Sequence, residues 1–385
     1  MKNRLSSRSS MKKPYLWPML SFILALPILL SSCSVHEWFE ETAEEHAFML
    51  YLDFDTDLPL HKEVYYTRGD DDTRAEEDNY DIRYIINIYK VKDASDESRS
   101  IDRTLVFTRP YNPDPDYSVA INLPEGNYRF RVWADYLIAG TNTDLHYNTS
   151  DFAEIMIHGE NGHPGNTEFR DAFNGTTYVT VTDPQIYEIL HGSVPDNSAR
   201  VPMKRPMGRY EFISTDMDEF LGKVIEDSEN EALIKSYEKL FSTKGEDFQV
   251  GDDLLTRDEI ADAIGLDKYH VVFSYNAFMP SSYNLYTDKP SDSSTGVKYE
   301  GKMQIGDDGM KLGFDYVLTN EQTSMNMNMK VYNADGDMIA SASGVEVPVV
   351  RSKNTVVKGA FLTVTSGGGV NINPEFDGDY NIEIE

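Results

Sequence analysis

The chain has 385 residues, with 65 Asp and Glu against 35 Lys and Arg, so its formal net charge is −30 at neutral pH. Such a surface repels nucleic acid and anionic lipid headgroups, which excludes DNA, RNA and direct docking on an anionic bilayer. A single cysteine excludes an intramolecular disulfide, so packed cores must stabilise the fold.

Residues 1–32 have the pattern of a secretory signal peptide. An apolar run over 15–30 follows a start that carries only positive charges, namely Lys2, Arg4, Arg8, Lys12 and Lys13. Met11 opens a second, shorter start, so the sequence leaves open where translation begins. Because cleavage removes these five cations and no acid, the mature chain has a net charge of −35.

The signal run ends in Leu30-Ser31-Ser32-Cys33, which resembles a bacterial lipobox. The thiol of Cys33 would take a diacylglycerol with acyl chains such as palmitate, and cleavage would fall between Ser32 and Cys33. Two or three acyl chains, at about 0.8 kcal/mol per buried methylene, anchor a protein stably. No other stretch approaches the roughly 20 apolar residues of a spanning helix. We therefore predict a lipoprotein tethered to the outer membrane and exposed at the cell surface.

Residues 33–45 form a lipidated acidic tether that contains five glutamates. Two interpretations stay open. The glutamates form a solvated spacer, or they resemble the export signal that carries some Bacteroidales lipoproteins to the outer face.

From residue 47 onward the sequence predicts short strands rich in Tyr, Phe, Val and Ile. Pro124-Glu125-Gly126-Asn127 joins two of them as a hairpin loop. Many short strands at near-regular spacing are typical of an all-β sandwich architecture. The predicted strands are 47–54, 84–91, 104–107, 117–123, 128–136, 176–181, 208–214, 269–278, 310–318, 327–333, 338–343, 345–350, 355–364 and 380–385.

Helix is predicted only locally, over 218–223, 229–241 and 256–264, as one insertion in a β domain. Thr256 with Glu259 three residues later forms the pattern of a capping box. Gly, Pro, Ser and Asn cluster over 191–202, which favours a linker within 184–204. We expect an N-terminal sandwich over 46–200 and a C-terminal sandwich over 201–385.

Six segments together resemble the fimbrillin-like lipoproteins of Bacteroidales. Three lie in the first half and three in the second: 81–89 (DIRYIINIY), 123–128 with 132–136 (LPEGNY, VWADY), 170–175 (RDAFNG), 203–212 (MKRPMGRYEF), 349–359 with 361–363 (VVRSKNTVVKG, FLT) and 372–379 (INPEFDGD). The resemblance implies two tandem transthyretin-like β-sandwich domains, and a type V pilus subunit that forms shaft, tip or anchor.

The same resemblance gives a role to Arg68 and Arg74. They lie in a polar stretch behind the first strand, where an exposed loop invites proteolysis. In pilins of this family an arginine-directed cut at such a place releases the first strand and leaves a groove for a neighbour's strand. Here the cut would also remove the lipid, so an anchor should resist it and a shaft subunit should undergo it.

Motifs for catalysis are missing from the sequence. There is no Gly-x-Ser-x-Gly elbow, phosphate loop or His-Glu-x-x-His, and no free cysteine once Cys33 is acylated. A carboxylate pair for glycoside hydrolysis is a spatial feature that spacing does not reveal. We expect no enzyme activity, no cofactor and no metal.

Acidic clusters could attract Ca²⁺, but solvated faces and turns are the favoured interpretation. The clusters are Asp53, Asp55 and Asp57; Asp70, Asp71 and Asp72; and Asn333, Asp335 and Asp337. The last is interpreted as a hairpin turn at Asp335-Gly336. Arg68-Gly69-Asp70 matches an integrin-type tripeptide, a match that arises often by chance.

The sequence therefore favours a structural and adhesive fimbrial subunit or anchor that joins other subunits by strand donation. The alternative is a surface lipoprotein that captures polysaccharide, and a host or glycan ligand fits either. An exposed row of Trp133, Tyr136, Tyr147 and Phe152 would support the alternative, whereas a core position for Trp133 is the favoured interpretation.

Overall fold

Strands with one or both faces buried make up most of the structure, a computed structural model in which 46–385 form one compact unit. It describes residues 45–54, 79–110, 117–159, 162–191, 196–226, 229–242, 255–363 and 380–384. No helix in these ranges is long and apolar enough to span a bilayer. The all-β sandwich fold with a small helical insertion is confirmed.

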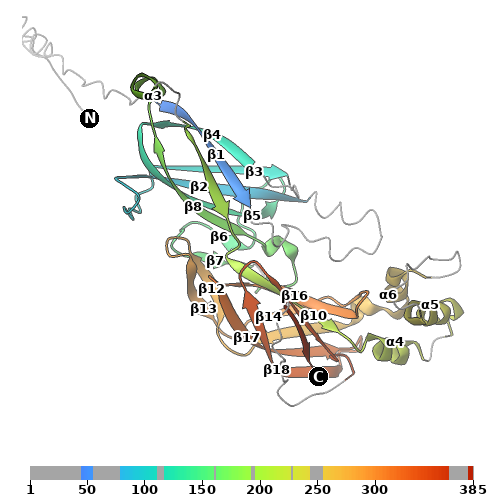
Figure 1. The fold of residues 1–385 in the computed structure, drawn as a ribbon. Coiled ribbons are helices and arrows are strands. Elements are labelled where there is room, and N and C mark those ends of the chain that lie inside the picture. Colours follow the sequence, from blue (N-terminus) through green and yellow to red (C-terminus); the bar gives the residue numbers. More distant parts are fainter. Residues whose placement is uncertain are drawn as a thin grey trace, which may run out of the picture. The chain divides into compact units, whose positions relative to one another are not determined.

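The first sandwich packs a four-stranded sheet, in the order β3-β2-β5-β8, against a three-stranded sheet, β4-β1-β9 (Figure 1). Ile82, Ile86 and Phe130 lie in the core between these sheets. Ile85 and Trp133 point from the opposite face of β2 and β5 into a second cluster, which explains their continuous apolar sequence. The strands are β1 Glu45–Phe54, β2 Tyr80–Val91, β3 Arg103–Pro110, β4 Tyr117–Pro124, β5 Gly126–Ile138, β8 Phe173–Val181 and β9 Ser198–Met203.

The second sandwich packs a five-stranded sheet, β15-β16-β10-β19-β20, against a four-stranded sheet, β14-β11-β17-β18. Alternate residues of β17, Met325, Met327 and Met329, enter its core. The two strands predicted over 338–350 are one strand, β18, because Gly344 adopts a φ of 69° at a register shift. The strands are β10 Met207–Ser214, β11 His270–Tyr275, β14 Lys298–Gly301, β15 Gln304–Ile305, β16 Met310–Leu318, β17 Gln322–Tyr332, β18 Met338–Val350, β19 Asn354–Gly359 and β20 Tyr380–Ile384.

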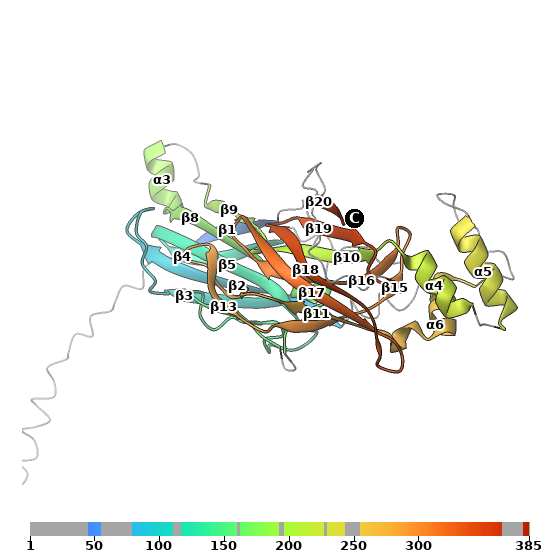
Figure 2. The same ribbon diagram turned by 90° about the horizontal axis from the view of Figure 1, so that it is seen from below.

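The helical insertion follows β10 and lies at one end of the second sandwich (Figures 1 and 2). It comprises α4 Met217–Ile225, α5 Glu231–Ser242 and α6 Arg257–Ile264, followed by the 3-10 turn η2 Leu266–Lys268. The predicted capping box is present, since Glu259 N donates to Thr256 Oγ1 at 3.2 Å and Thr256 N donates to Glu259 Oε2 at 2.8 Å. Phe220, Leu221 and Ile260 join the core of the sandwich.

An antiparallel sheet that the sequence does not predict joins the two halves. Its order is β13-β12-β7-β6, with β6 Tyr147–Asn148 and β7 Ile155–Ile157 from the first half and β12 Met279–Asn284 and β13 Lys289–Ser294 from the second. Trp133, Tyr147, Met207 and Tyr283 pack together beside it in one buried cluster. Strand pairing and a shared core therefore connect the two sandwiches.

The predicted linker region contains regular structure. Helix α3 Pro184–His191 occupies its start, and β9 Ser198–Met203 pairs with β1 in the first sandwich. The expected boundary between residues 200 and 201 lies within β9, and β10 begins at Met207. The division into two independent domains stays a prediction.

Candidate functional site

Strand β1 fills the centre of the three-stranded sheet, between β4 and β9. Its alternating sequence buries Phe48, Leu50 and Leu52 at 2%, 0% and 1% exposure. Phe48 stacks on Phe130 of the opposite sheet, with ring centroids 5.7 Å apart. Each of the three apolar side chains stabilises the sandwich by about 1.5–3 kcal/mol when fully covered. The core of the first sandwich therefore depends on the first described strand.

The outer face of β1 is held much more weakly. Asp53 forms an ion pair with Arg200 of β9 at 2.7 Å, and the same guanidinium lies 5.1 Å from the centre of the Tyr51 ring. Both ionic side chains are largely exposed, so this pair contributes little. What fixes β1 is its apolar face and its parallel pairing with β9, from Met49 opposite Ser198 to Phe54 opposite Met203. Any extended segment with the same alternation could meet both requirements.

The four predicted processing and lipidation residues, Ser32, Cys33, Arg68 and Arg74, lie outside the described residues. The position of the two arginines along the chain still matters, because 55–78 connect β1 to β2. A cut in this segment separates β1 and all that precedes it from the rest of the chain. The possible integrin tripeptide and the acidic residues 55, 57 and 70–72 also lie outside the described residues.

The alternative to a core position for Trp133, an exposed aromatic platform for sugars, is not formed by these four residues. Trp133, Tyr136, Tyr147 and Phe152 are only 0%, 2%, 1% and 3% exposed. Trp133 packs edge-on against Tyr147, with centroids 5.3 Å apart. Trp133 is buried, as the favoured interpretation predicts. It belongs, however, to the cluster between the sandwiches rather than to the core of the first sandwich.

The acidic cluster after β17 forms the expected turn. Asn333 Oδ1 accepts hydrogen bonds from the backbone N–H groups of Asp335 and Asp337, at 3.1 and 2.8 Å. Gly336 has a φ of 83°, which a glycine adopts without strain. Within the described ranges, no three His, Cys, Asp or Glu side chains gather as ligands for a metal.

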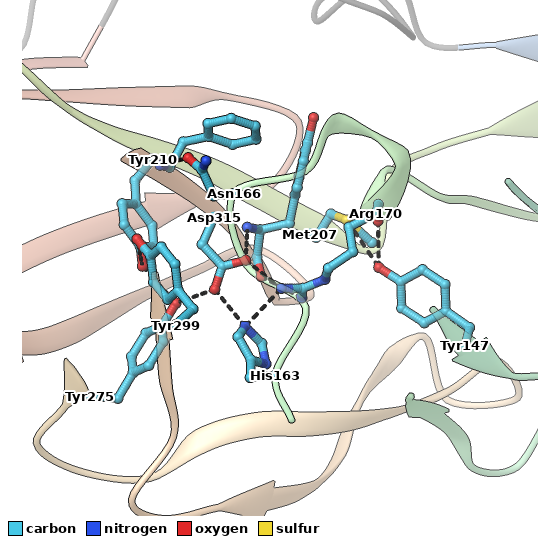
Figure 3. A network of polar contacts seen from close by, with 11 residues as sticks. Tyr147, His163, Asn166, Arg170, Met207, Tyr210, Tyr275, Tyr299 and Asp315 are labelled. Atoms are coloured by element: carbon cyan, nitrogen blue, oxygen red, sulfur yellow. Dashed lines mark hydrogen bonds and ion pairs between the residues drawn. The ribbon is translucent and has the colours of Figure 1, made fainter. Parts of the chain in front are cut away.

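A buried charged network, shown in Figure 3, connects the first half of the chain to the second sandwich. Arg170, at the end of the 3-10 turn η1 Glu168–Arg170, pairs with Asp315 of β16, and neither side chain is exposed. The second guanidinium nitrogen of Arg170 donates to the carbonyl of Tyr316 at 2.7 Å. Tyr147 OH donates to the Arg170 carbonyl at 2.5 Å. This arginine is held by groups from both halves.

Asp315 is the centre of this network. Its Oδ2 lies 2.6 Å from Nε2 of His163 and accepts a bond of 2.6 Å from Tyr275 OH, which itself lies 2.6 Å from Tyr210 OH. Burial alone would raise the pKa of Asp315, but the charge of Arg170 and the contact with His163 outweigh it and lower the pKa. Asp315 is thus an ionised, fully hydrogen-bonded carboxylate.

A second buried ion pair lies beside the first. Asp171 accepts a bidentate contact from Arg205, with Nε–Oδ1 and Nη2–Oδ2 distances of 2.8 Å, and both side chains are fully buried. Arg209 bonds to Glu168 at 2.9 Å and to Glu211 at 3.0 Å. We name Arg170, Asp171, Arg205, Arg209 and Asp315 the charged junction. Its closed position favours a structural role, because a group without exposure does not reach a substrate in solvent.

The sequence reading missed the charged junction, although a signal was present. Four of its residues lie in RDAFNG and MKRPMGRYEF, two of the segments that carried the family resemblance. Charged residues inside otherwise apolar strand segments are rarely buried unless paired. That rule indicates buried ion pairs, but only the fold shows that Arg170 finds its partner 145 residues away.

Several solved structures are similar to this chain. The fimbrial anchor protein Mfa2 from Porphyromonas gingivalis is 13% identical, over 77% of this chain and 82% of that one, with a TM-score of 0.36. A candidate adhesin from Bacteroides ovatus is 11% identical, over 89% and 96%, with a TM-score of 0.42. A candidate polysaccharide-binding protein from Bacteroides thetaiotaomicron is 9% identical, over 77% and 80%, with a TM-score of 0.35.

A fimbrial anchor protein and a candidate adhesin are thus among the structures to which this chain is similar. No curated protein matches the chain. The model of a family of unknown function (DUF6562) matches residues 45–385, and the chain therefore belongs to that family.

Proposed function

We propose that the mature chain is a lipid-anchored, surface-exposed subunit or anchor of a fimbrium, and that it joins other subunits by strand donation. The observation that carries this proposal is the place of β1. It is the central strand of its sheet, its apolar face completes a core, and it is connected to the rest of the chain only through 55–78. Removing it would open a groove between β4 and β9.

The segments before and after β1 have different functions in this proposal. Upstream, Cys33 carries the lipid and the acidic tether spaces the sandwich from the outer membrane. Downstream, Arg68 and Arg74 are the places where an arginine-directed protease would cut. An uncut chain keeps both lipid and β1 and serves as an anchor. A cut chain loses both and accepts the extended strand of a neighbour through backbone hydrogen bonds.

We assign the chain a structural and adhesive role, without enzyme activity or cofactor. The charged junction suits a subunit that bears mechanical force, since buried ion pairs hold the first half of the chain against the second sandwich. Breaking such pairs leaves uncompensated buried charges, which is strongly unfavourable. The partners we propose are the lipid bilayer through the anchor and other fimbrial subunits.

The lipid anchor is tested by Cys33→Ala in cells that make the protein. Without its thiol the precursor should stay unprocessed and take up no palmitate, while the unchanged chain is labelled and surface-exposed. Undiminished palmitate labelling of the variant would contradict lipidation at this residue.

The fimbrial role is tested on isolated surface polymers, whose peptides are identified by mass spectrometry. Peptides from 79–385 without those from 45–54 identify a cut shaft subunit, and peptides from both regions identify an anchor that keeps β1. If polymers rich in other subunits hold neither set while the chain is present on the cells, the fimbrial proposal is wrong.

A further inference from the structure

A polar groove of about 470 Å³ lies beside the joint between the two halves. Its floor is the outer face of β5 and β8, where Arg131 stands opposite Thr176 and Arg129 opposite Tyr178. The loop after β12, with Leu285 and Tyr286, forms one wall, and Lys204 lies at another. We name this the junction groove. Its size suits one or two sugar rings better than a long strand.

The junction groove is cationic although the chain is strongly acidic. Its lining contains four cationic and two anionic side chains. The cationic ones are Arg129, Arg131, Lys204 and Arg351, and the anionic ones are Glu97 and Asp288. Arg351 and Asp288 pair with each other at 2.7 Å. The remaining three cations have only Glu97 beside them in the lining, so positive charge is left in excess. A cleft of one sign concentrates ligands of the other.

Two of these cations are fixed and poorly compensated. Arg129 and Arg131 side chains are 8% and 4% exposed, and both contact the single carboxylate of Glu97, at 2.7 and 3.2 Å. That carboxylate is itself 69% exposed, so its charge is screened by water. Burial, followed by the charge of Arg129, lowers the pKa of Arg131. A second anion would stabilise this pair of guanidinium groups.

The geometry around Arg131 is preorganised. Its guanidinium stacks 4.6 Å from the centre of the Tyr286 ring and donates to the Leu285 carbonyl at 3.2 Å. Arg99 stacks on the same ring at 4.5 Å. Because guanidinium groups occupy the ring, Tyr286 serves to position Arg131 rather than to stack on a sugar. Neutral donors stand alongside, since Thr176 and Tyr178 also line the groove.

We propose that the junction groove binds an acidic saccharide, with the carboxylate of a uronic acid near Arg129, Arg131 and Lys204 and its hydroxyl groups near Thr176 and Tyr178. Charged hydrogen bonds to a carboxylate supply affinity, and neutral donors match sugar hydroxyls. This site is separate from β1 and does not depend on strand donation.

The test uses the full mature chain, 33–385, in detergent and measures binding of trigalacturonate by calorimetry. Trigalactose, which has the same rings without carboxylates, should bind at least on the order of tenfold more weakly, and added salt should weaken trigalacturonate binding. No binding of trigalacturonate, or equal binding of the neutral sugar, would overturn the proposal. A glutamate tripeptide that binds as tightly as trigalacturonate would overturn the saccharide assignment.

Exposed side chains allow variants that do not disturb folding. Lys204→Gln should weaken binding several-fold, and Glu97→Gln should strengthen it because a competing carboxylate is lost. Arg200→Gln is the matched control: it removes the same charge four residues away, outside the groove lining, and should leave the affinity unchanged. Equal losses in Lys204→Gln and Arg200→Gln would show diffuse attraction to the surface and refute a built site.

Discussion

At the scale of single residues, buried ion pairs hold the halves together while exposed ones contribute little. Arg170→Ala should lower the free energy of unfolding by about 3–5 kcal/mol, because the buried carboxylate of Asp315 loses its guanidinium partner. Arg200→Ala removes an exposed pair with Asp53 and should cost less than about 1 kcal/mol. Urea denaturation measures both. A loss below 1 kcal/mol for Arg170→Ala would show that the charged junction is not a main support.

His146 introduces a pH dependence. Burial, then the charges of Arg170, His158 and His163, lower the pKa of His146 from 6.5 to about 3. The unfolded chain therefore binds a proton at this residue near pH 6.5, whereas the folded chain does so only near pH 3. Stability from the neutral ring is complete above pH 6.5 and declines as the pH falls toward 3.

A His146→Gln variant isolates this contribution. Between pH 7 and pH 4 its free energy of unfolding should fall less steeply than that of the unchanged chain, when each is measured by urea denaturation at successive pH values. Parallel curves for the two proteins would mean that His146 titrates alike in the folded and unfolded states.

At the scale of elements, β20 is an edge strand that closes its own sheet. It pairs in parallel with β19, from Thr355 opposite Tyr380 to Gly359 opposite Ile384. Along its sequence Tyr380, Ile382 and Ile384 alternate with polar residues, a pattern typical of a strand with one apolar face.

A chain that ends at Asp379 should therefore have a lower melting temperature, because the five-stranded sheet loses the pairing of β20 with β19. Calorimetry measures the shift. Unchanged melting together with lost entry into surface polymers would instead assign β20 to a neighbouring subunit.

Sequence patterns predicted the helices and strands in which buried residues recur at a regular spacing within one segment. Strand β5 follows from its many aromatic residues, β17 from its alternating residues, and α6 from its capping box. The antiparallel sheet that joins the two halves escaped prediction because β6 and β7 have only two and three residues. In addition, β7 pairs with β12, where Ile155 lies opposite Tyr283, a residue far away along the chain. Helix α3 was missed because turn-forming residues dominate the segment that follows it.

The candidate sites, like the helices and strands, could be predicted only where their sequence pattern is local. The alternation of Phe48, Leu50 and Leu52 was visible in the sequence, but the central place of β1 between β4 and β9 was not. Arg131 and Lys204 are 73 positions apart, and only the fold brings both to the junction groove. The residue type indicates whether a side chain is buried, but the topology determines which distant residue it contacts.

At the scale of the whole molecule, a shared buried cluster and a shared sheet favour unfolding in one step. Trp133 and Tyr147 pack against Met207 and Tyr283, so neither sandwich keeps all its packing alone. We expect a single calorimetric transition for 46–385, with equal calorimetric and van't Hoff enthalpies. Two separated transitions would support the independent domains that the sequence suggested.

Strand donation requires that β1 can be replaced by another strand of the same sequence pattern. The measurement is the melting temperature of mature protein cut by an arginine-specific protease between β1 and β2, with and without a synthetic peptide of 45–54. A matched control peptide carries serine in place of Phe48, Leu50 and Leu52.

After the cut and removal of the β1 fragment, the melting temperature should drop, because three buried apolar side chains are lost from the core. The 45–54 peptide should restore it and the serine peptide should not. If the cut protein melts like the intact one after the fragment is gone, or if both peptides have the same effect, β1 is not a replaceable strand.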